Sequence, residues 1–430
     1  MAGARECSGS SGARAGRWAV ALALGALLAS VWGGSAAAAG CGGKKECRCG
    51  DRVERDTRLG ASLGPCPQDG LTLAAGVTLD GGGHTLRGAG LAGTAGIRLP
   101  AGSTGAVVRN LEITGFARGL RFIGVRGARA EGLDVHHNGD RRQHKGYGID
   151  FGDGASGNTV ARSRVHDNAD EGIHVGTAAN DNRLLAVEAW GNSRENLYFL
   201  QNSGNRVEGG RVGAAGEAAV YIKHARATVL SGVLIAGGIV HIRGNSVATV
   251  LEQVRITDGG IVLEPYRKGG TVSGTPADTR IEGGSIAGPS ACLRIDGARG
   301  TLLRETRLTC DPAVRIGGGA TLETRGLSRD AIRCNGAARV RGTAPSRLLF
   351  LDSEGKPLSG VKLLAPAGRV LAVSDAAGRI REALPAWEVE CPGRTEEAVK
   401  LIARHGGWTR EVAVGESTPV VVEPWPAGGR

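Results

Sequence analysis

The sequence predicts an all-β protein whose main part is a right-handed parallel β-helix, and three observations lead to this fold. Glycine supplies 73 of the 430 residues, whereas aromatic residues make up only 3%. Pairs of a small residue and an aliphatic residue recur at nearly constant intervals through the middle of the chain. No stretch of that region has helical periodicity. The composition therefore disfavours a helical globule and favours stacked strands joined by many tight turns.

The first 39 residues have the order of a secretory signal. Arg14 and Arg17 precede the apolar run WAVALALGALLASVW, and the small residues SAAAA follow it. No later run approaches the roughly 18 apolar residues that a membrane span needs, so we expect no transmembrane span. We expect the protein to be secreted, periplasmic or at the cell surface. Lipid attachment at Cys41 is an alternative. The three residues before it, Ala38-Ala39-Gly40, lack the large aliphatic residue that such sites usually carry, which argues against it.

The cysteines predict disulfides. Eight remain after the signal, an even number that in an exported protein suggests up to four bridges whose connectivity the sequence leaves open. The Cys-x-Cys pair of Cys47 and Cys49 could bind a metal ion, but no neighbouring histidine supports this. Four of the eight fall between residues 40 and 72, a segment that we expect to form a cysteine-rich cap on the N-terminal end of the β-helix.

A repeat defines the predicted β-helix over residues 73–343. Successive spacings between its landmark pairs are 23, 29, 24, 24 and 23 residues, and the 29 contains one insertion, residues 139–145. A single coil of this kind cannot bury its apolar side alone, so neighbouring coils must stack. We expect the asparagines at one turn, Asn138, Asn168 and Asn192, to form an internal hydrogen-bonded ladder. The landmark pairs are Gly96-Ile97, Gly119-Leu120, Gly148-Ile149, Gly172-Ile173, Asn196-Leu197 and Ala219-Val220.

A composition change at residues 342–346 predicts a second, smaller domain over residues 346–430. Strand-like segments there alternate with Gly and Pro turns. The stretches Gly355-Lys356-Pro357-Leu358-Ser359-Gly360-Val361 and Asp375-Ala376-Ala377-Gly378 resemble the transthyretin-like (carboxypeptidase regulatory-like) β-sandwich. This resemblance implies a small β-sandwich that displays or tethers, without a catalytic constellation of its own.

Residues 41–343 resemble the pectin-lyase-like right-handed β-helix superfamily, including its NosD-type carbohydrate-binding and sugar-hydrolase repeats. The entry coil GVTLDGGGHTLRG, residues 76–88, is typical of secreted bacterial members. The superfamily contains lyases, hydrolases, epimerases and structural proteins, so this resemblance implies the fold and leaves the activity open.

Two short motifs further resemble the mannuronan C5-epimerase catalytic module. Tyr147-Gly148-Ile149-Asp150 matches the start of that family's Tyr-Gly-Phe-Asp-Pro-His motif, but Phe151 and Gly152 follow, so the histidine is missing there. One coil later, His166-Asp167-Asn168-Ala169-Asp170-Glu171-Gly172-Ile173 is similar to His-Asp-Asn-Gly-x-Asp-Gly-Phe, with Glu171 at the functional aspartate. Arg194 stands where the family has an arginine, whereas Glu195 replaces its histidine.

Strand alternation predicts a polar stripe across five coils. If Ile149 and Phe151 point inward, Asp150 points outward, and the same register places one outward residue on each following coil. Stacked strands lie about 4.8 Å apart, so these residues form a column of neighbours. The column contains Asp150, His174, Tyr198, Tyr221 and His241; a second column contains Lys223, Arg243 and Glu264; and the preceding turn supplies Tyr147, Asp170, Glu171, Arg194, Glu195 and Glu217.

The stripe and a net charge of +11 predict an acidic polysaccharide as partner. Uronate C5-proton chemistry, as in an epimerase or lyase, needs a cation beside the sugar carboxylate, and Arg194, Lys223 and Arg243 are candidates. It also needs a base and an acid, which His174 and Tyr147 or Tyr198 could supply. Asp150 and Glu171 would hold the histidine or bind the sugar, and four further residues of the stripe would bind substrate: Asp170, Glu195, Tyr221 and His241.

Other interpretations of the stripe remain open. Asp150, Asp170 and Glu171 could instead be the carboxylates of a glycoside hydrolase. A non-catalytic surface or adhesion module would use the same groove only for binding, and a solvated wall would carry polar residues without binding anything. Clustered acids suit Ca²⁺, although no complete ligand set is legible and no cofactor is certain. No nucleic-acid-binding motif occurs, so we expect no nucleic-acid partner, and we expect a monomer.

Overall fold

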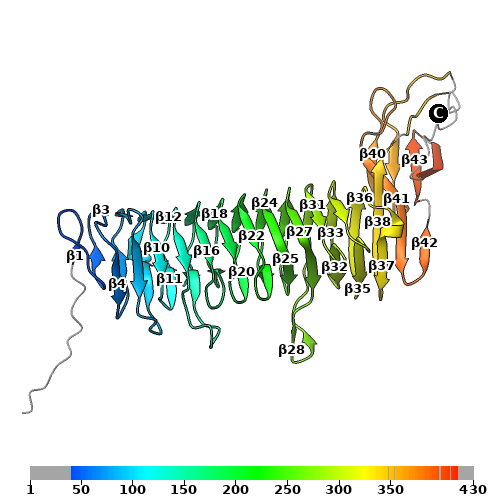
Figure 1. Ribbon diagram of the computed structural model, residues 1–430. Helices are drawn as coiled ribbons and strands as arrows, with labels where there is room; N and C mark the ends of the chain where they lie inside the picture. Colours follow the sequence, from blue (N-terminus) through cyan, green and yellow to red (C-terminus); the bar gives the residue numbers. More distant parts are fainter. Residues whose placement is uncertain (1–39, 347, 353, 397–398, 407, 415–430) are drawn as a thin grey trace, which may run out of the picture. The chain divides into compact units, whose positions relative to one another are not determined.

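The computed structural model describes residues 40–346, 348–352, 354–396, 399–406 and 408–414. The predicted signal, residues 1–39, lies outside the described residues. In the described part the chain forms β-strands, turns and two 3-10 helices, η1 (Ala101–Ser103) and η2 (Arg329–Ala331), and none of its helices is long and apolar enough to cross a membrane. Its strands stack in parallel ladders, which confirms the predicted all-β, right-handed parallel β-helix (Figure 1).

Each coil contributes strands to three faces. The first face, which carries the predicted stripe, is made of β1 (Gly40–Cys41), β2 (Arg52–Val53), β5 (Leu71–Leu73), β8 (Ala95–Pro100), β11 (Arg118–Ile123), β14 (Tyr147–Gly152), β17 (Ile173–Val175), β20 (Glu195–Leu200), β23 (Ala218–Lys223), β32 (Leu293–Asp296), β35 (Val314–Gly317) and β37 (Ile332–Asn335). The second face is made of β4 (Leu63–Cys66), β7 (Thr85–Gly88), β10 (Glu112–Thr114), β13 (Asp134–His136), β16 (Arg164–His166), β19 (Glu188–Trp190), β22 (Arg211–Gly213), β31 (Ser285–Ala287) and β34 (Arg307–Thr309). Two long strands, β25 (Leu234–Arg243) and β27 (Arg255–Glu264), run through both faces and join them into one sheet.

The third face forms a sheet of its own. Its parallel strands are β3 (Thr57–Arg58), β6 (Thr78–Asp80), β9 (Val107–Arg109), β12 (Arg129–Glu131), β15 (Thr159–Ala161), β18 (Arg183–Leu185), β21 (Arg206–Glu208), β24 (Val229–Ser231), β26 (Val250–Glu252), β30 (Arg280–Glu282), β33 (Thr301–Arg304), β36 (Ala320–Arg325) and β38 (Ala338–Pro345). The sheet then continues antiparallel with β41 (Ala383–Cys391) and β42 (Arg394–Glu396). A short hairpin, β28 (Arg267–Lys268) with β29 (Thr271–Val272), projects from the coils (Figure 1).

The core is a continuous apolar column inside the coils. On β14, Ile149 and Phe151 point inward and are fully buried, and the Phe151 ring stacks on Phe122 of the preceding coil with centroids 4.4 Å apart. Because side chains alternate along a strand, Asp150 between them points outward. The predicted alternation is therefore confirmed at the strand where the candidate site begins.

Glycine is needed at positions 148 and 172 of the landmark pairs because successive coils approach closely there. A Cβ built on Gly148 would lie 2.6 Å from both the Gly172 carbonyl oxygen and the Asn168 amide nitrogen, and one on Gly172 would lie 2.7 Å from the Asn196 carbonyl oxygen. Any larger side chain would collide with the next coil. This contact explains the glycine in the repeat.

The asparagine ladder is present. The side-chain oxygen of Asn168 accepts hydrogen bonds from the backbone N–H and the side-chain amide of Asn138, and Asn192 repeats both contacts with Asn168. A second ladder of Asn158, Asn182 and Asn205, which the sequence analysis missed, follows the other end of the first-face strands. The two ladders satisfy buried backbone groups at the turns that flank the stripe.

Four disulfides connect all eight cysteines of the described part: Cys41–Cys47, Cys49–Cys66, Cys292–Cys310 and Cys334–Cys391. The first two lie in the segment predicted as a cap, whose strands β1, β2 and β5 already pair in parallel with the coils that follow. Cys41, the lipid-attachment alternative, is bonded to Cys47. Four bridges indicate folding in an oxidising compartment.

After the last coil, the chain forms a four-stranded antiparallel sheet of β39 (Lys362–Leu364), β40 (Val370–Val373), β43 (Val399–His405) and β44 (Trp408–Val414). Its own apolar cluster includes Phe350, Val361, Leu401 and Leu384 of β41. The resemblance to a β-sandwich and the boundary at residue 346 remain predictions, and residues 415–430 of that segment lie outside the described residues.

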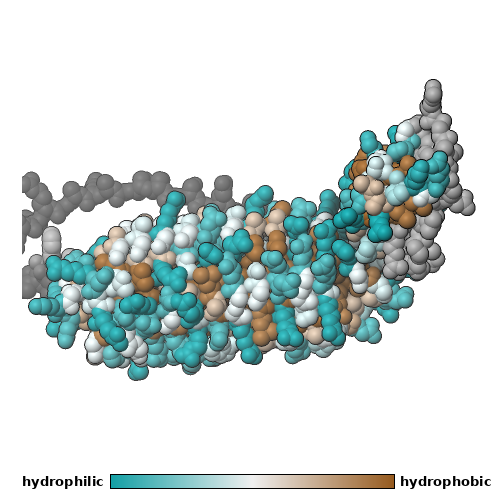
Figure 2. All heavy atoms as spheres, turned by 90° about the horizontal axis from the view of Figure 1, so that it is seen from above, coloured by the Kyte–Doolittle hydropathy of each residue, from teal (hydrophilic) through white to brown (hydrophobic). Residues whose placement is uncertain are grey.

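Figure 2 shows one face of the molecule, on which hydrophilic side chains are spread among small hydrophobic patches. An even distribution of this kind is usual for a solvated surface. A candidate site therefore has to be identified from specific side-chain contacts.

Candidate active site on the first face

Five rings form a nearly continuous stack along the first face. The strand register aligns Asp150 with His174, His174 with Tyr198, Tyr198 with Tyr221, and Tyr221 with His241, which is the predicted column. The side chain of Tyr147 lies against the column, and its ring stacks on His174 with centroids 4.5 Å apart. The centroid distances from His174 to His241 are then 5.7, 5.2 and 4.8 Å. We call Tyr147, His174, Tyr198, Tyr221 and His241 the ring column.

Asp150 and His174 form a hydrogen-bonded pair at one end of the ring column. His174 Nδ1 lies 3.0 Å from Asp150 Oδ1, and Asp150 is only 3% exposed. The other carboxylate oxygen accepts a hydrogen bond from Arg121 Nε at 3.1 Å and forms an ion pair with Arg118 Nε at 3.1 Å. Two guanidinium groups thus hold Asp150 as a carboxylate, which can only accept hydrogen bonds. His174 Nδ1 must therefore carry the proton, and Nε2 is left as a free acceptor.

The two tyrosines that flank His174 are held in their protonated forms. Burial, together with the nearby carboxylates of Glu171 and Asp150, raises the pKa of Tyr147 to about 12. Burial also raises the pKa of Tyr198, with further contributions from Tyr221 and Glu195. The His174 imidazole therefore lies between two phenols that retain their protons, so that Nε2 and two proton donors are adjacent.

A second group of charges surrounds Arg194 in the turn before the ring column. Its guanidinium forms ion pairs of 3.0–3.8 Å with four carboxylates, those of Glu217, Asp170, Glu171 and Glu195. Glu171 and Glu195 are only 3% and 1% exposed, and the Oε2 atom of each has no hydrogen-bond partner in the described part of the chain. One cation faces four acids, so the group is electrostatically unbalanced.

Burial favours the protonated forms of the innermost acids of this group. It raises the pKa of Glu171 to about 8, helped by the charges of Asp170 and Glu195, and the pKa of Glu195 to about 7, against the opposing effect of Arg194. The pKa of Asp170 is also raised by burial. By contrast, the hydrogen bond from Arg194 lowers the pKa of the exposed Glu217. Proton uptake by the buried acids relieves the excess negative charge around Arg194.

The second predicted column begins with two cations on one aromatic ring. Lys223, Arg243 and Glu264 are in register, as predicted. Lys223 Nζ lies 4.0 Å from the centre of the Tyr266 ring, and the Arg243 guanidinium lies 5.4 Å from it. Glu264 binds both Arg243 Nε at 3.3 Å and His241 Nε2 at 3.1 Å. Among these residues Lys223 has no carboxylate partner in the part of the chain described, so its charge is available to an anion.

A cavity of about 260 Å³ adjoins the ring column at Tyr147. It lies between the loop of Leu91 and the insertion that the sequence marks in the repeat. Arg118, Lys145, Tyr147 and Asp170 contribute to its wall. The cavity is close to the lower end of the range for small-ligand sites, about 300 Å³.

The acids around Arg194 are not arranged as metal ligands in the described part of the chain. Within the described ranges, no group of three or more His, Cys, Asp or Glu side chains is arranged to hold a metal ion. Asp170, Glu171 and Glu195 converge on the Arg194 guanidinium, which already supplies a positive charge among them. The carboxylates that could bind calcium are therefore already paired with Arg194.

The structure brings the predicted residues into three groups: the ring column with Asp150, the acids around Arg194, and the second column of Lys223, Arg243 and Glu264. Sequence reasoning missed Arg118 and Arg121, although the repeat contained the signal. The register aligns Arg118 with Tyr147 and Arg121 with Asp150.

Together, fold and site define a right-handed parallel β-helix that carries a polar and aromatic site on one face. Residues 95–252 match the family model described as a right handed beta helix region. This range contains the ring column, Asp150 and Arg194. Among curated proteins, no sequence matches the chain.

Several solved structures are similar to the chain at low identity. An alginate lyase from a Paenibacillus species is 16% identical, with 67% of this chain and 86% of that chain covered and a TM-score of 0.36. The A-module of a mannuronan C-5 epimerase from Azotobacter vinelandii is 18% identical, with the same coverage and a TM-score of 0.37. A surface adhesin of Streptococcus pneumoniae is 10% identical, with 87% and 89% covered and a TM-score of 0.35. These proteins differ in activity, so the function of this chain has to be argued from its own site.

Proposed function

We propose that the protein is exported and binds an acidic polysaccharide along the ring column, where it removes the C5 proton of a uronate residue as an epimerase or lyase. The observation that carries this proposal is the pair of His174 and buried Asp150, with Tyr147 stacked on the imidazole. It places a base, the group that orients the base, and a proton donor around one point on the first face.

In this proposal His174 is the base. Asp150 fixes the tautomer in which Nδ1 is protonated, and it stabilises the positive charge that develops when Nε2 takes a proton. The side chain of His174 is 15% exposed, so Nε2 can meet a substrate while the opposite side of the ring is held. General base catalysis of this kind contributes about 10²–10⁴-fold in rate.

Tyr147 is the corresponding acid. Its raised pKa keeps the phenol protonated through neutral pH, so it can donate but not accept a proton. In an epimerase the donated proton goes to the opposite face of C5; in a lyase it goes to the oxygen of the leaving sugar. Tyr198, on the other side of His174, is the second candidate for this donor.

The uronate carboxylate needs a positive charge beside it, because removal of the C5 proton moves negative charge onto its oxygens. Arg118 suits this role, since its guanidinium is 5.3 Å from the Tyr147 ring centre and the residue lines the adjoining cavity. Lys145 lines the same cavity, and Lys223 offers a further cation along the column. Arg194 is already paired with four carboxylates, so it acts through the electrostatic potential around the turn.

Glycoside hydrolysis is the second candidate, and one observation favours it. Glu171 and Glu195 have pKa values near neutrality, which suits a general acid. Both are almost completely buried, however, so contact with a glycosidic oxygen would require the turn to open. This keeps C5-proton chemistry as the better-supported function.

Product analysis on a panel of polysaccharides tests the proposal. The purified protein is incubated with polymannuronate, polyguluronate, polygalacturonate and a neutral glucan as control. We expect an altered uronate composition, or unsaturated ends that absorb in the ultraviolet, on at least one polyuronate and neither on the glucan. Reducing ends without unsaturation would establish hydrolysis instead. Binding without any product would indicate an adhesion module, and absence of binding would contradict the proposed substrate class.

A further inference from the structure

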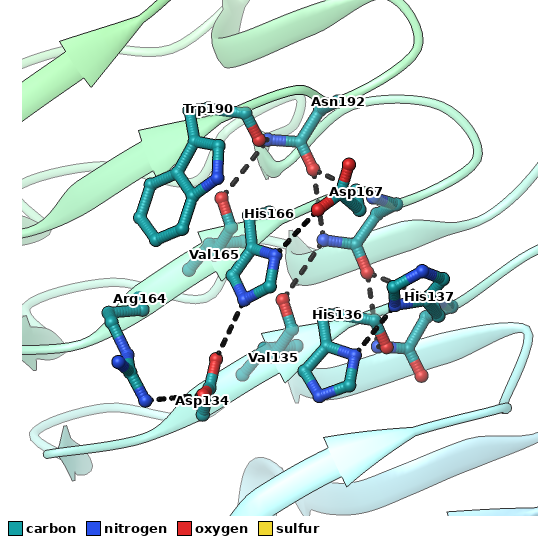
Figure 3. Close-up of polar contacts among 12 residues, drawn as sticks. Asp134, Val135, His136, His137, Arg164, Val165, His166, Asp167, Trp190 and Asn192 are labelled. Atoms are coloured by element: carbon teal, nitrogen blue, oxygen red, sulfur yellow. Dashed lines mark hydrogen bonds and ion pairs between the residues drawn. The ribbon is translucent and has the colours of Figure 1, made fainter.

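The second face carries its own aromatic stack, separate from the ring column. His136, His166 and Trp190 occupy the same register position on successive strands β13, β16 and β19. The His166 ring lies 5.0 Å from His136 and 4.5 Å from Trp190, nearly parallel to both (Figure 3). These three residues are called the second-face stack. Nothing in the proposed chemistry uses them.

Carboxylates hold the histidine end of the second-face stack. His166 is tied through Nε2 to Asp134 at 3.0 Å and through Nδ1 to Asp167 at 2.8 Å (Figure 3). His136 Nε2 lies 2.9 Å from Glu112 Oε1. Both imidazoles are fixed by these contacts, so the indole of Trp190 rests on a rigid base.

The stack ends at Trp190 because the next two coils offer no ring. The register places Gly213 after Trp190 and Ala236 after Gly213. The atoms nearest to a Cβ built on Gly213 would be the Cβ of Trp190 at 2.9 Å, the Cα of Trp190 and the carbonyl oxygen of Ala189. The position that another ring of the stack would fill therefore lacks a side chain, and the indole face away from His166 looks over it.

An unpaired cation lies beside this vacant position. Arg211 is two residues before Gly213, points to the same side of β22 and is exposed. It stands in register with Glu188, yet the described residues provide no ion pair or side-chain hydrogen bond to its guanidinium. An aromatic face and a free guanidinium are thus presented side by side.

We infer that Trp190 and Arg211 form a second carbohydrate-binding site, in which a uronate ring stacks on the free indole face and its carboxylate binds Arg211. The C–H groups on one side of a pyranose ring suit the negative face of an indole. The strand spacing of about 4.8 Å matches the separation of stacked rings, so a sugar ring fits the next position of the stack. The choice of a uronate rests on the proposed substrate class; the site itself rests on the second-face stack.

The site lies on the other side of the turn that leads from Trp190 to Glu195, and it contains no catalytic residue. Its role is to hold one part of the polysaccharide while another part of the same polysaccharide binds at the ring column. A purely structural role for Trp190 predicts that its removal changes stability alone.

The test measures binding of a short uronate oligosaccharide by calorimetry. The parent protein carries Asp150→Asn and His174→Ala so that the ligand is not consumed, and we expect two binding events. Adding Trp190→Ala should remove one event, or weaken it at least about ten-fold. Adding Arg211→Ala should weaken the same event for the uronate but not for a neutral oligosaccharide. Arg183→Ala, on the third face, is the matched control and should change nothing.

A variant that keeps Trp190 guards against misfolding. Ala236→Phe introduces a ring over the vacant position without replacing any residue of the second-face stack, and it should also remove the second event. If neither Trp190→Ala nor Ala236→Phe changes binding, the inference is wrong and the proposed function stands. If both remove an event while no variant of the ring column affects turnover on any polyuronate, the proposed chemistry is wrong and the second site stands. A parent without any uronate binding overturns both.

Discussion

Replacing His174 with alanine is expected to lower turnover of a polyuronate by about 10²–10⁴-fold with little change in its affinity. The imidazole holds Asp150 through Nδ1 and presents Nε2 between two phenols that keep their protons. Substrate binding is spread over the cations and rings of several coils, so the loss of one side chain affects it little. Initial rates and a separate binding isotherm measure the two quantities.

Asp150→Asn is expected to reduce turnover in the same way, because the amide no longer stabilises the developing imidazolium or fixes its tautomer. His84→Ala is the matched control, since His84 lies in the turn between β6 and β7 and should keep full activity. Full activity of both His174→Ala and Asp150→Asn on a demonstrated substrate would remove this pair from the chemistry.

Replacing Glu171 with glutamine is expected to make the protein more stable in alkali, by about 2–4 kcal/mol at pH 9. The ordinary pKa of a glutamate is 4.5, and that of folded Glu171 is about 8. Between these values the folded state holds a proton that the unfolded state has released. The free energy of unfolding therefore falls as pH rises through this window, and the neutral glutamine removes that loss.

Urea unfolding at pH 5 and pH 9 measures this effect in parent and variant. Glu217→Gln is the control: its carboxylate is exposed and its pKa is lowered by Arg194, so we expect a small effect of opposite sign. Parallel stability curves for the parent and Glu171→Gln would mean that Glu171 is ionised in the fold.

Much of the first face could be predicted from the sequence because a β-helix translates spacing directly into contacts. Once the landmark pairs were aligned, the register placed Asp150 beside His174 and Tyr198 beside Tyr221, and the structure has both. The same register would have placed Arg121 beside Asp150. Arg121 was not assigned to the site because it stands one coil before the acids, histidines and tyrosines that define the polar stripe.

Turn residues could not be predicted in the same way. Alternation fixes the direction of side chains inside a strand, but not in the turn before it, so the burial of Glu171 and Glu195 around Arg194 was not foreseen. The second-face stack could have been predicted from the sequence but was not. His136, His166 and Trp190 each stand two residues before an asparagine of the first ladder, so the repeat already aligns them.

The central claim is that His174 and Tyr147 move the C5 proton of a uronate, and exchange in heavy water tests it most directly. The protein is incubated with a polyuronate in D₂O, and deuterium at C5 and unsaturated chain ends are measured by NMR. The account predicts deuterium at C5 of inverted residues, or an unsaturated end that has lost its C5 proton, and the loss of either signal in His174→Ala. A polymer that binds to the ring column and is altered with every C5 proton retained would contradict it.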